Sequence, residues 1–286
     1  MKKDDSRVRV VRNIERAIKE NDLNRKVEET DPVMTEEQRK RVILKFDILK
    51  KNPINKLKAN IARNIVDKLT KQINAETEIV GLENIENIET GAIITSNHFS
   101  KVDNTVIRYL MQKIGKSKNF YIIVQETNML MEGQIGWLLK NCYTIPICSN
   151  FEYTGQRFLP ALKKIFDRKG FLLIYPEKEM WYNYRKPRRM KIGAYHYACK
   201  FDIPVVPCFI EIQDTDTVGE DGFYASKYKL HVLPPIYPDK TKNLKERKEE
   251  MLKKDYEVRV KKYEEIYLRK YDAEFDNEKD IAGWCS

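Results

Sequence analysis

The stretch that decides the fold is Ala92-Ile93-Ile94-Thr95 followed by Ser96-Asn97-His98-Phe99-Ser100-Lys101-Val102-Asp103. The first four residues are apolar or β-branched, which predicts a buried strand. His98, one of three histidines in the chain, follows that strand, and Asp103 comes five residues later. A histidine with a nearby carboxylate can act as a general base, because the carboxylate fixes the ring tautomer and stabilises its charge. Each residue also has an ordinary reading: Asp103 can cap a helix, and His98 can be a structural histidine.

The same kind of apolar run recurs along the chain, and helical patterns separate the runs. Strands are predicted at 92–95, 121–124, 144–147, 171–175 and 205–212, with a further candidate at 229–233. Helices are predicted at 104–114, 133–141, 156–168 and 191–200. This alternation predicts an α/β fold in which helices cover a mixed sheet. We assign this α/β domain to residues 76–240.

Residues 1–75 read as a helical N-terminal segment. Thr35 and Gln38 form a capping-box pattern ahead of apolar residues at helical spacing, which are Val42, Ile43, Phe46 and Leu49. Asn52-Pro53 predicts the start of a second helix. That helix carries an apolar stripe made of Ile54, Leu57, Ile61, Ile65, Leu69 and Ile73, and its other face holds Lys56, Lys58, Arg63, Lys68 and Lys71. Such a helix can lie on an anionic membrane surface, or it can pack on the core and leave its basic face in water.

Residues 241–286 are expected to form a charged C-terminal helix over about 244–271, appended to the surface of the domain. The 286 residues carry a net charge of +10, with 42% hydrophobic residues, which favours a soluble globular chain over a disordered one. No apolar run approaches the roughly 20 residues that span a bilayer, and the N-terminus lacks the apolar core of a signal peptide. The five cysteines form no CxxC pair, so we expect reduced cytosolic thiols and no structural zinc.

A second group of polar residues follows the strand predicted at 171–175. Tyr175-Pro176-Glu177-Lys178 comes first, and the run 185–191 then holds five cations in seven residues. Such a run can neutralise the phosphates of a lipid headgroup or of coenzyme A. It can also bind RNA beside the preceding aromatic residues, or form a solvated loop.

Taken together, these motifs resemble those of the glycerolipid acyltransferase family. The first is Asn97-His98 through Asp103, including Ser100, and the others are Tyr175-Pro176-Glu177, Lys191-Ile192-Gly193-Ala194 and Ile203-Pro204-Val205-Val206-Pro207. Gly136-Trp137 and Thr144–Ile147 resemble the second-motif region, and the resemblance covers residues 78–235. Two features depart from the family pattern. Lys178-Glu179-Met180 replaces the usual Gly-Thr-Arg, and Cys148-Ser149 stands where an acceptor-binding arginine is usual.

The resemblance implies acyl transfer from acyl-coenzyme A or acyl carrier protein to a hydroxyl of a lysophospholipid or glycerol-phosphate-type acceptor. It implies His98 as general base and Asp103 as its orienting carboxylate, with no metal or cofactor. The expected substrate-binding residues are Ser100, Glu177, Lys178, Arg185, Arg188 and Arg189. We expect a cytoplasmic protein, peripheral on the anionic inner face of the cell membrane, with no nucleic-acid partner. The alternative is a non-catalytic, lipid-binding or nucleic-acid-binding basic protein on the same fold. A serine hydrolase is excluded, because the chain has no Gly-x-Ser-x-Gly.

Overall fold

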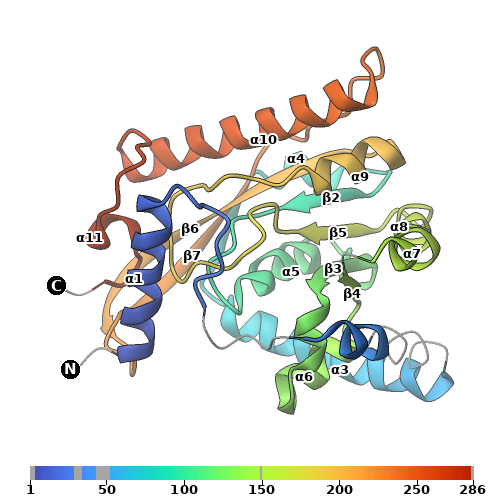
Figure 1. Ribbon diagram of the computed structural model, residues 1–286, viewed down its shortest axis with the longest axis horizontal. Helices are drawn as coiled ribbons and strands as arrows, with labels where there is room; N and C mark the ends of the chain where they lie inside the picture. Colours follow the sequence, from blue (N-terminus) through green and yellow to red (C-terminus); the bar gives the residue numbers. More distant parts are fainter. Residues whose placement is uncertain (1–3, 29–33, 43–51, 149, 285–286) are drawn as a thin grey trace.

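The computed structural model describes residues 4–28, 34–42, 52–148 and 150–284. In this part of the chain seven strands form one sheet, in the order β1-β7-β6-β2-β5-β3-β4 (Figure 1). The strands are β1 (Glu78–Val80), β2 (Ala92–Thr95), β3 (Phe120–Gln125), β4 (Thr144–Ile147), β5 (Phe171–Ile174), β6 (Val205–Val218) and β7 (Tyr224–Val232). The central strands are parallel, whereas β7 pairs antiparallel with β6. This confirms the predicted α/β fold with a mixed sheet.

Helices cover both faces of the sheet. One face packs against α4 (Glu83–Glu86) and α5 (Asp103–Lys113), and the other against α8 (Leu159–Phe166), α9 (Gly193–Phe201) and α10 (Leu244–Tyr267). The remaining elements are α1 (Asp5–Lys19), α3 (Pro53–Ile73), η1 (Ser117–Asn119), η2 (Glu126–Leu130), α6 (Gly133–Asn141), α7 (Phe151–Tyr153), η3 (Thr154–Phe158) and α11 (Asn277–Asp280). The helix predicted at 156–168 starts earlier, at Phe151, and a π-helical turn at Thr154–Phe158 separates α7 from α8.

Strand β2, which leads to His98, is the best-protected strand of the sheet. All four of its residues are buried, and it pairs with β5 on one side and β6 on the other. Gly91, just before β2, has a φ of +78°, and a Cβ there would lie 2.3 Å from the carbonyl oxygen of Gly170. Glycine is required at this position because the chain must pass so close to the start of β5. The residues after β2 therefore follow the carboxyl end of a buried central strand that is paired on both sides.

The N-terminal helix starts agree with the prediction. The Thr35 hydroxyl accepts the N–H of Gln38, and the Gln38 side chain accepts the N–H of Thr35, so the capping box is formed. Residues 36–42 are helical, whereas Ile43, Phe46 and Leu49 lie outside the described residues. Asn52 caps α3, accepting the N–H of Ile54 at 3.0 Å.

The apolar stripe of α3 does not pack on the core. Its six residues keep from 41% to 63% of their surface exposed: Ile54, Leu57, Ile61, Ile65, Leu69 and Ile73. The buried side of the helix consists instead of Ala62 and Thr70. The core-packed reading of this stripe is therefore wrong. Figure 1 shows α3 beside α6 at the edge of the molecule opposite α10.

The C-terminal helix α10 is not an appended surface helix, contrary to the expectation. It packs on α9 and β6 and buries one side, made of Met251, Asp255, Arg259 and Tyr263. The prediction failed because two of these residues are charged and neutralise each other inside the protein. Beyond α10 the chain returns to α1, where Val10, Trp181 and Ile281 share one hydrophobic cluster. The three predicted segments of the chain thus meet in common core.

Candidate active site

His98 and Asp103 face each other across the turn that joins β2 to α5. Nδ1 of His98 lies 2.8 Å from Oδ2 of Asp103, and the same oxygen accepts the backbone N–H groups of Phe99 and Ser100 at 2.9 and 3.1 Å. Asp103 is fully buried, whereas the His98 side chain is 22% exposed. An ionised carboxylate can only accept hydrogen bonds, so we assign the ring proton of neutral His98 to Nδ1. The Nε2 lone pair then remains available to take a proton.

Tyr175, directly after β5, contacts both members of this pair. Its hydroxyl donates to Oδ1 of Asp103 at 2.6 Å, and its ring stacks on the His98 ring with centroids 4.0 Å apart. Burial, together with the negative charge of Asp103, raises the pKa of Tyr175 well above its ordinary value. The hydroxyl therefore stays protonated and serves as a donor. The sequence placed Tyr175 in a motif but carried no sign of this contact.

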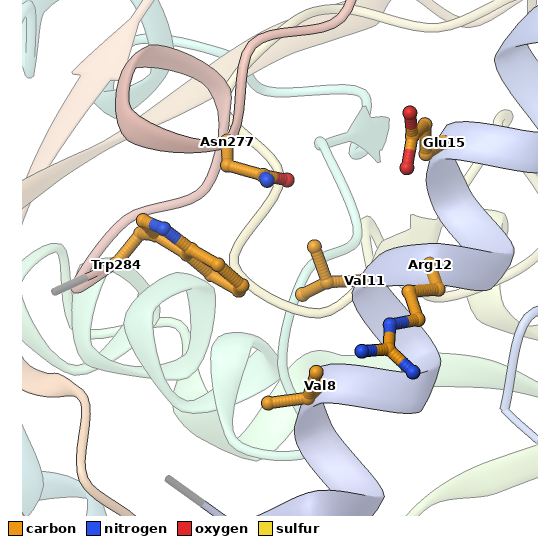
Figure 2. A pocket seen from close by; sticks show the side chains of 6 residues that line it. All are labelled: Val8, Val11, Arg12, Glu15, Asn277 and Trp284. Carbon is orange, nitrogen blue, oxygen red and sulfur yellow. The ribbon is translucent and has the colours of Figure 1, made fainter. Parts of the chain in front are cut away.

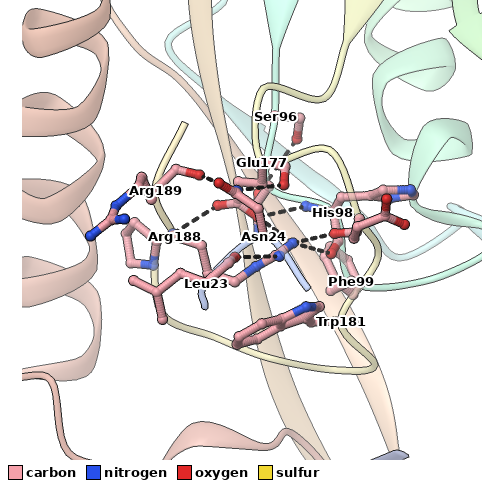
Figure 3. Close-up of polar contacts among 12 residues, drawn as sticks. Leu23, Asn24, Ser96, His98, Phe99, Glu177, Trp181, Arg188 and Arg189 are labelled. Atoms are coloured by element: carbon pink, nitrogen blue, oxygen red, sulfur yellow. Dashed lines mark hydrogen bonds and ion pairs between the residues drawn. The ribbon is translucent and has the colours of Figure 1, made fainter. Parts of the chain in front are cut away.

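Glu177 lies close to the backbone of His98, but its carboxylate is buried in the protein interior. It is 1% exposed and accepts the backbone N–H of Arg188 at 3.0 Å and that of His98 at 3.4 Å. Nη2 of Arg188 lies 2.9 Å from the carboxylate (Figure 3). Glu177 therefore links the loop after β5 to the backbone of His98.

Three of the five cations in the predicted run 185–191 are buried, and this corrects the interpretation of Arg185 and Arg188. Arg185 pairs with Asp214 at 2.6 Å, and Lys186 pairs with Asp272 and Asp280 at 2.7 and 3.0 Å. Arg188 is 1% exposed and pairs with Glu177. These three buried cations are thus each paired with a carboxylate of the protein, from the same loop for Arg188 and from more distant parts of the sequence for Arg185 and Lys186.

The other predicted substrate-binding residues remain accessible. Arg189 is exposed, and Lys178, which is 54% exposed, pairs with Glu179 at 3.0 Å. Ser100 is half-buried, and its hydroxyl oxygen accepts the N–H of Val102 at 3.3 Å. Asn97 turns inward, and its amide exchanges hydrogen bonds of 3.0 and 2.9 Å with the backbone of Ile210. Asn97 thereby ties the end of β2 to β6.

A shallow cavity of about 300 Å³ lies apart from His98 and Asp103, between α1 and the C-terminal residues (Figure 2). It is lined by Val8, Val11, Arg12, Glu15, Asn277 and Trp284. Among the described residues, no group of histidine, cysteine and acidic side chains is arranged to hold a metal ion. Across the same residues, none of the helices combines the length and the apolar character needed to cross a membrane.

Part of the chain is similar to known acyltransferases. The family model described as Acyltransferase matches residues 76–211, which include His98, Asp103, Tyr175 and Glu177. This is the kind of family that the motifs around His98 and Glu177 resemble. Among curated acyltransferases, the chloroplastic 1-acyl-sn-glycerol-3-phosphate acyltransferase BAT2 of Brassica napus is 25% identical over 172 residues, covering 58% of this chain. The chain spans about half the length of that relative, 46%.

The acyltransferase fold is also found in a solved structure. The crystal structure of the 1-acyl-sn-glycerophosphate (LPA) acyltransferase PlsC from Thermotoga maritima matches with a TM-score of 0.51 and 19% identity. The match covers 81% of this chain and 89% of the other. Residues 4–28 and all of α10 lie outside the range of the acyltransferase family model.

Proposed function

We propose that this protein is an O-acyltransferase. It moves a fatty acyl group from a thioester, acyl-coenzyme A or acyl carrier protein, to a hydroxyl of a lysophospholipid or glycerol-phosphate-type acceptor. The observation that carries the proposal is the 2.8 Å contact between His98 Nδ1 and the buried Asp103 carboxylate, which leaves Nε2 free to act as a base. The match of residues 76–211 to the Acyltransferase family model supports the same reaction.

In the proposed mechanism, Nε2 of His98 takes the proton of the acceptor hydroxyl as its oxygen attacks the thioester carbonyl carbon. Asp103 stabilises the imidazolium that forms. The tetrahedral intermediate then collapses, the C–S bond breaks, and the imidazolium returns the proton to the departing thiolate. No acyl-enzyme and no metal take part in this scheme.

For the acceptor, accessible cations of the loop after β5 are the candidates. We propose that Lys178 and Arg189 contact phosphate groups of the substrates, because both are exposed on the loop that also holds Glu177. Ser100 lies two residues after His98 and is partly accessible, so it is a further candidate for acceptor binding. Arg185 and Arg188 do not belong to this set, since their guanidinium groups are buried in internal ion pairs.

We further propose that α3 docks the enzyme on an anionic bilayer surface, on the cytoplasmic face of the cell membrane. The exposed apolar stripe of α3 is accompanied by exposed Lys58, Lys68 and Lys71, the pattern of helices that lie in a membrane interface. Ile135, on helix α6, which contacts α3, is also 56% exposed. Cations near an anionic leaflet each contribute about 1 kcal/mol of attraction.

The function is tested by measuring thiol release from acyl-coenzyme A and from acyl carrier protein. The acceptors are lysophosphatidic acid, glycerol 3-phosphate and an uncharged lysolipid, presented with vesicles. We expect transfer to at least one acceptor. Vesicle binding without transfer to any acceptor would overturn the enzymatic proposal in favour of a non-catalytic lipid-binding member of the family. Salt-sensitive binding of RNA without transfer would favour the nucleic-acid-binding alternative.

A further inference from the structure

A short N-terminal segment, Leu23–Arg25, lies against the loop that carries Glu177. We call it the strap. The side-chain amide of Asn24 donates to the carbonyl oxygens of Glu177 and Arg189, at 3.0 and 2.7 Å (Figure 3). One amide therefore ties together both ends of the loop segment 177–189. The strap lies far outside residues 76–211, to which the family model is confined.

Arg188 connects the strap to His98. Its Nη1 donates to the carbonyl oxygen of Leu23 at 3.2 Å, and its Nη2 lies 3.4 Å from the carbonyl oxygen of His98. The same Nη2 pairs with the Glu177 carboxylate and also donates to the carbonyl oxygen of Glu179. The guanidinium lies over the ring of Trp181, 4.4 Å from its centroid.

Trp181 makes the same connection by a second route. Its indole N–H donates to the carbonyl oxygen of Arg25 at 2.9 Å, and its backbone N–H donates to the carbonyl oxygen of His98 at 3.0 Å. Next along the loop, the N–H of Asn183 donates to the carbonyl oxygen of Phe99 at 3.0 Å. The backbone of His98 and Phe99 is therefore held by a loop that is itself held by the strap.

We propose that Asn24 and Arg188 are positioning residues for His98, and that the strap completes the active site from the N-terminal side. This inference rests on the proposed acyltransferase function. The direction of the His98 ring depends on its backbone, so loosening the loop moves Nε2 relative to the acceptor hydroxyl. Displacement of a reacting group by about 1 Å can lower a rate by about 100-fold. Arg188 accordingly acts through His98 and does not bind the substrate phosphate.

The test compares Asn24→Ala with Asn13→Ala. Asn13 lies on α1 and also donates its amide to a carbonyl of the N-terminal segment, that of Val27 at 3.1 Å, so Asn13→Ala removes a comparable hydrogen bond whose acceptor lies outside the Glu177 loop. We expect Asn24→Ala to lower kcat at least about tenfold with KM for the acyl thioester within about twofold, as for a group lost from the transition state alone. Asn13→Ala should keep the wild-type kcat. Equal kcat values for the two variants at similar Tm would overturn the proposal.

A spectroscopic measurement separates this inference from the proposed function. The chain has three histidines, so the His98 ring signals can be assigned in an NMR spectrum by comparison with His98→Gln. We expect Asn24→Ala to shift these signals and Asn13→Ala to leave them in place, whether or not any acyl acceptor is found. Unchanged His98 signals in Asn24→Ala would contradict the positioning role on their own. If the wild type transfers no acyl group but Asn24→Ala still shifts the His98 signals, only the proposed function is overturned.

Arg188→Lys provides a second, independent variant. Lysine keeps the positive charge beside Glu177, but it lacks the planar fork that reaches both Leu23 and His98. We expect kcat to fall about tenfold while KM stays nearly unchanged. A raised KM for the phosphate-bearing substrate with unchanged kcat would instead assign Arg188 to substrate binding and overturn its positioning role.

Discussion

The hydroxyl of Tyr175 donates a 2.6 Å hydrogen bond to Oδ1 of Asp103, while its ring stacks on His98 at an interplanar angle of 14°. The Tyr175 side chain thus contacts both His98, the proposed general base, and Asp103, its orienting carboxylate. The stack limits rotation of the imidazole, and the hydrogen bond keeps the carboxylate turned so that Oδ2 meets Nδ1. Strand β5, neighbour of β2 in the sheet, brings Tyr175 to this position.

Replacing Tyr175 with phenylalanine separates these two contributions. Tyr175→Phe keeps the stacked ring but leaves Oδ1 of the buried Asp103 without its hydroxyl donor. A buried acceptor left unsatisfied costs about 1–3 kcal/mol, so we expect a fall in kcat of about tenfold. Steady-state kinetics checks this, and Tyr175→Leu, which also removes the stack, should lose more. Wild-type kcat in Tyr175→Phe would show that the hydroxyl has no part in catalysis.

Buried thiols and phenols predict how stability depends on pH. Burial raises the pKa of Cys142 to about 11 and the pKa values of Cys208 and Tyr228 to about 12. Because folding raises these pKa values, the protonated, neutral form of each group favours the folded state. The contribution of each group to the free energy of unfolding is therefore complete below its ordinary pKa, which is near 9 for a thiol and near 10 for a phenol. We expect the free energy of unfolding to fall as the pH rises from about 9 to about 12. Urea unfolding at a series of pH values measures this, and stability that increases above pH 9 would contradict it.

The ion pair between Asp255 and Arg259 lies on α10, the helix that the sequence suggested was appended to the surface. We expect that breaking this pair lowers the free energy of unfolding strongly. Both side chains are fully buried at 2.5 Å, and Asp255 also accepts the hydroxyls of Thr95 and Tyr195 at 2.6 and 2.8 Å. Removing one partner of a buried pair leaves an uncompensated charge, so Arg259→Met should lower the free energy of unfolding by about 3–5 kcal/mol.

A matched control for Arg259→Met exists on the same helix. Lys253 and Glu257 form a pair with the same spacing but with side chains 75% and 58% exposed. Lys253→Met should cost less than about 1 kcal/mol in urea denaturation. Similar costs for the two substitutions would mean that the buried pair contributes nothing particular to the fold.

The membrane proposal predicts that binding depends on the α3 stripe. Leu57→Ser and Ile61→Ser should each weaken binding to vesicles containing phosphatidylglycerol about tenfold, since burying such a side chain contributes about 1.5–3 kcal/mol. Leu268→Ser is the control, because Leu268 is 90% exposed just after α10, away from α3. Cosedimentation measures the binding. Unchanged binding in the α3 variants would exclude the stripe, and equal wild-type binding to neutral vesicles would exclude the electrostatic contribution.

Much of the fold was predictable because its signals are local. The apolar runs of β2, β4 and β5 and the Asn52-Pro53 start of α3 lie at the expected residues. β1 was missed because it has three residues and no buried one. β6 continues to Val218 through polar sequence, because its outer half is supported by pairing with β7 rather than by burial.

The site was predictable only in part, because only its local contacts are visible in the sequence. His98 and Asp103 are five residues apart, so their pairing is visible in sequence. The Tyr175 hydroxyl reaches Asp103 over 72 positions, and Asn24 reaches Glu177 over 153. Arg185 is buried and paired because strand β6 brings Asp214 close to it, 29 positions further along the chain. Composition showed the cations, but only the fold showed which of them are neutralised.

The most direct test of the account is the acyl-transfer rate of His98→Ala, measured beside the wild type with acyl-coenzyme A and the best acceptor. His98 and Asp103 act as a unit, so we expect a loss of several orders of magnitude in kcat, with Asp103→Asn also severely impaired. Circular dichroism should show that His98→Ala keeps the fold, because its ring is partly exposed. A folded His98→Ala variant that transfers acyl groups at the wild-type rate would contradict the proposed mechanism.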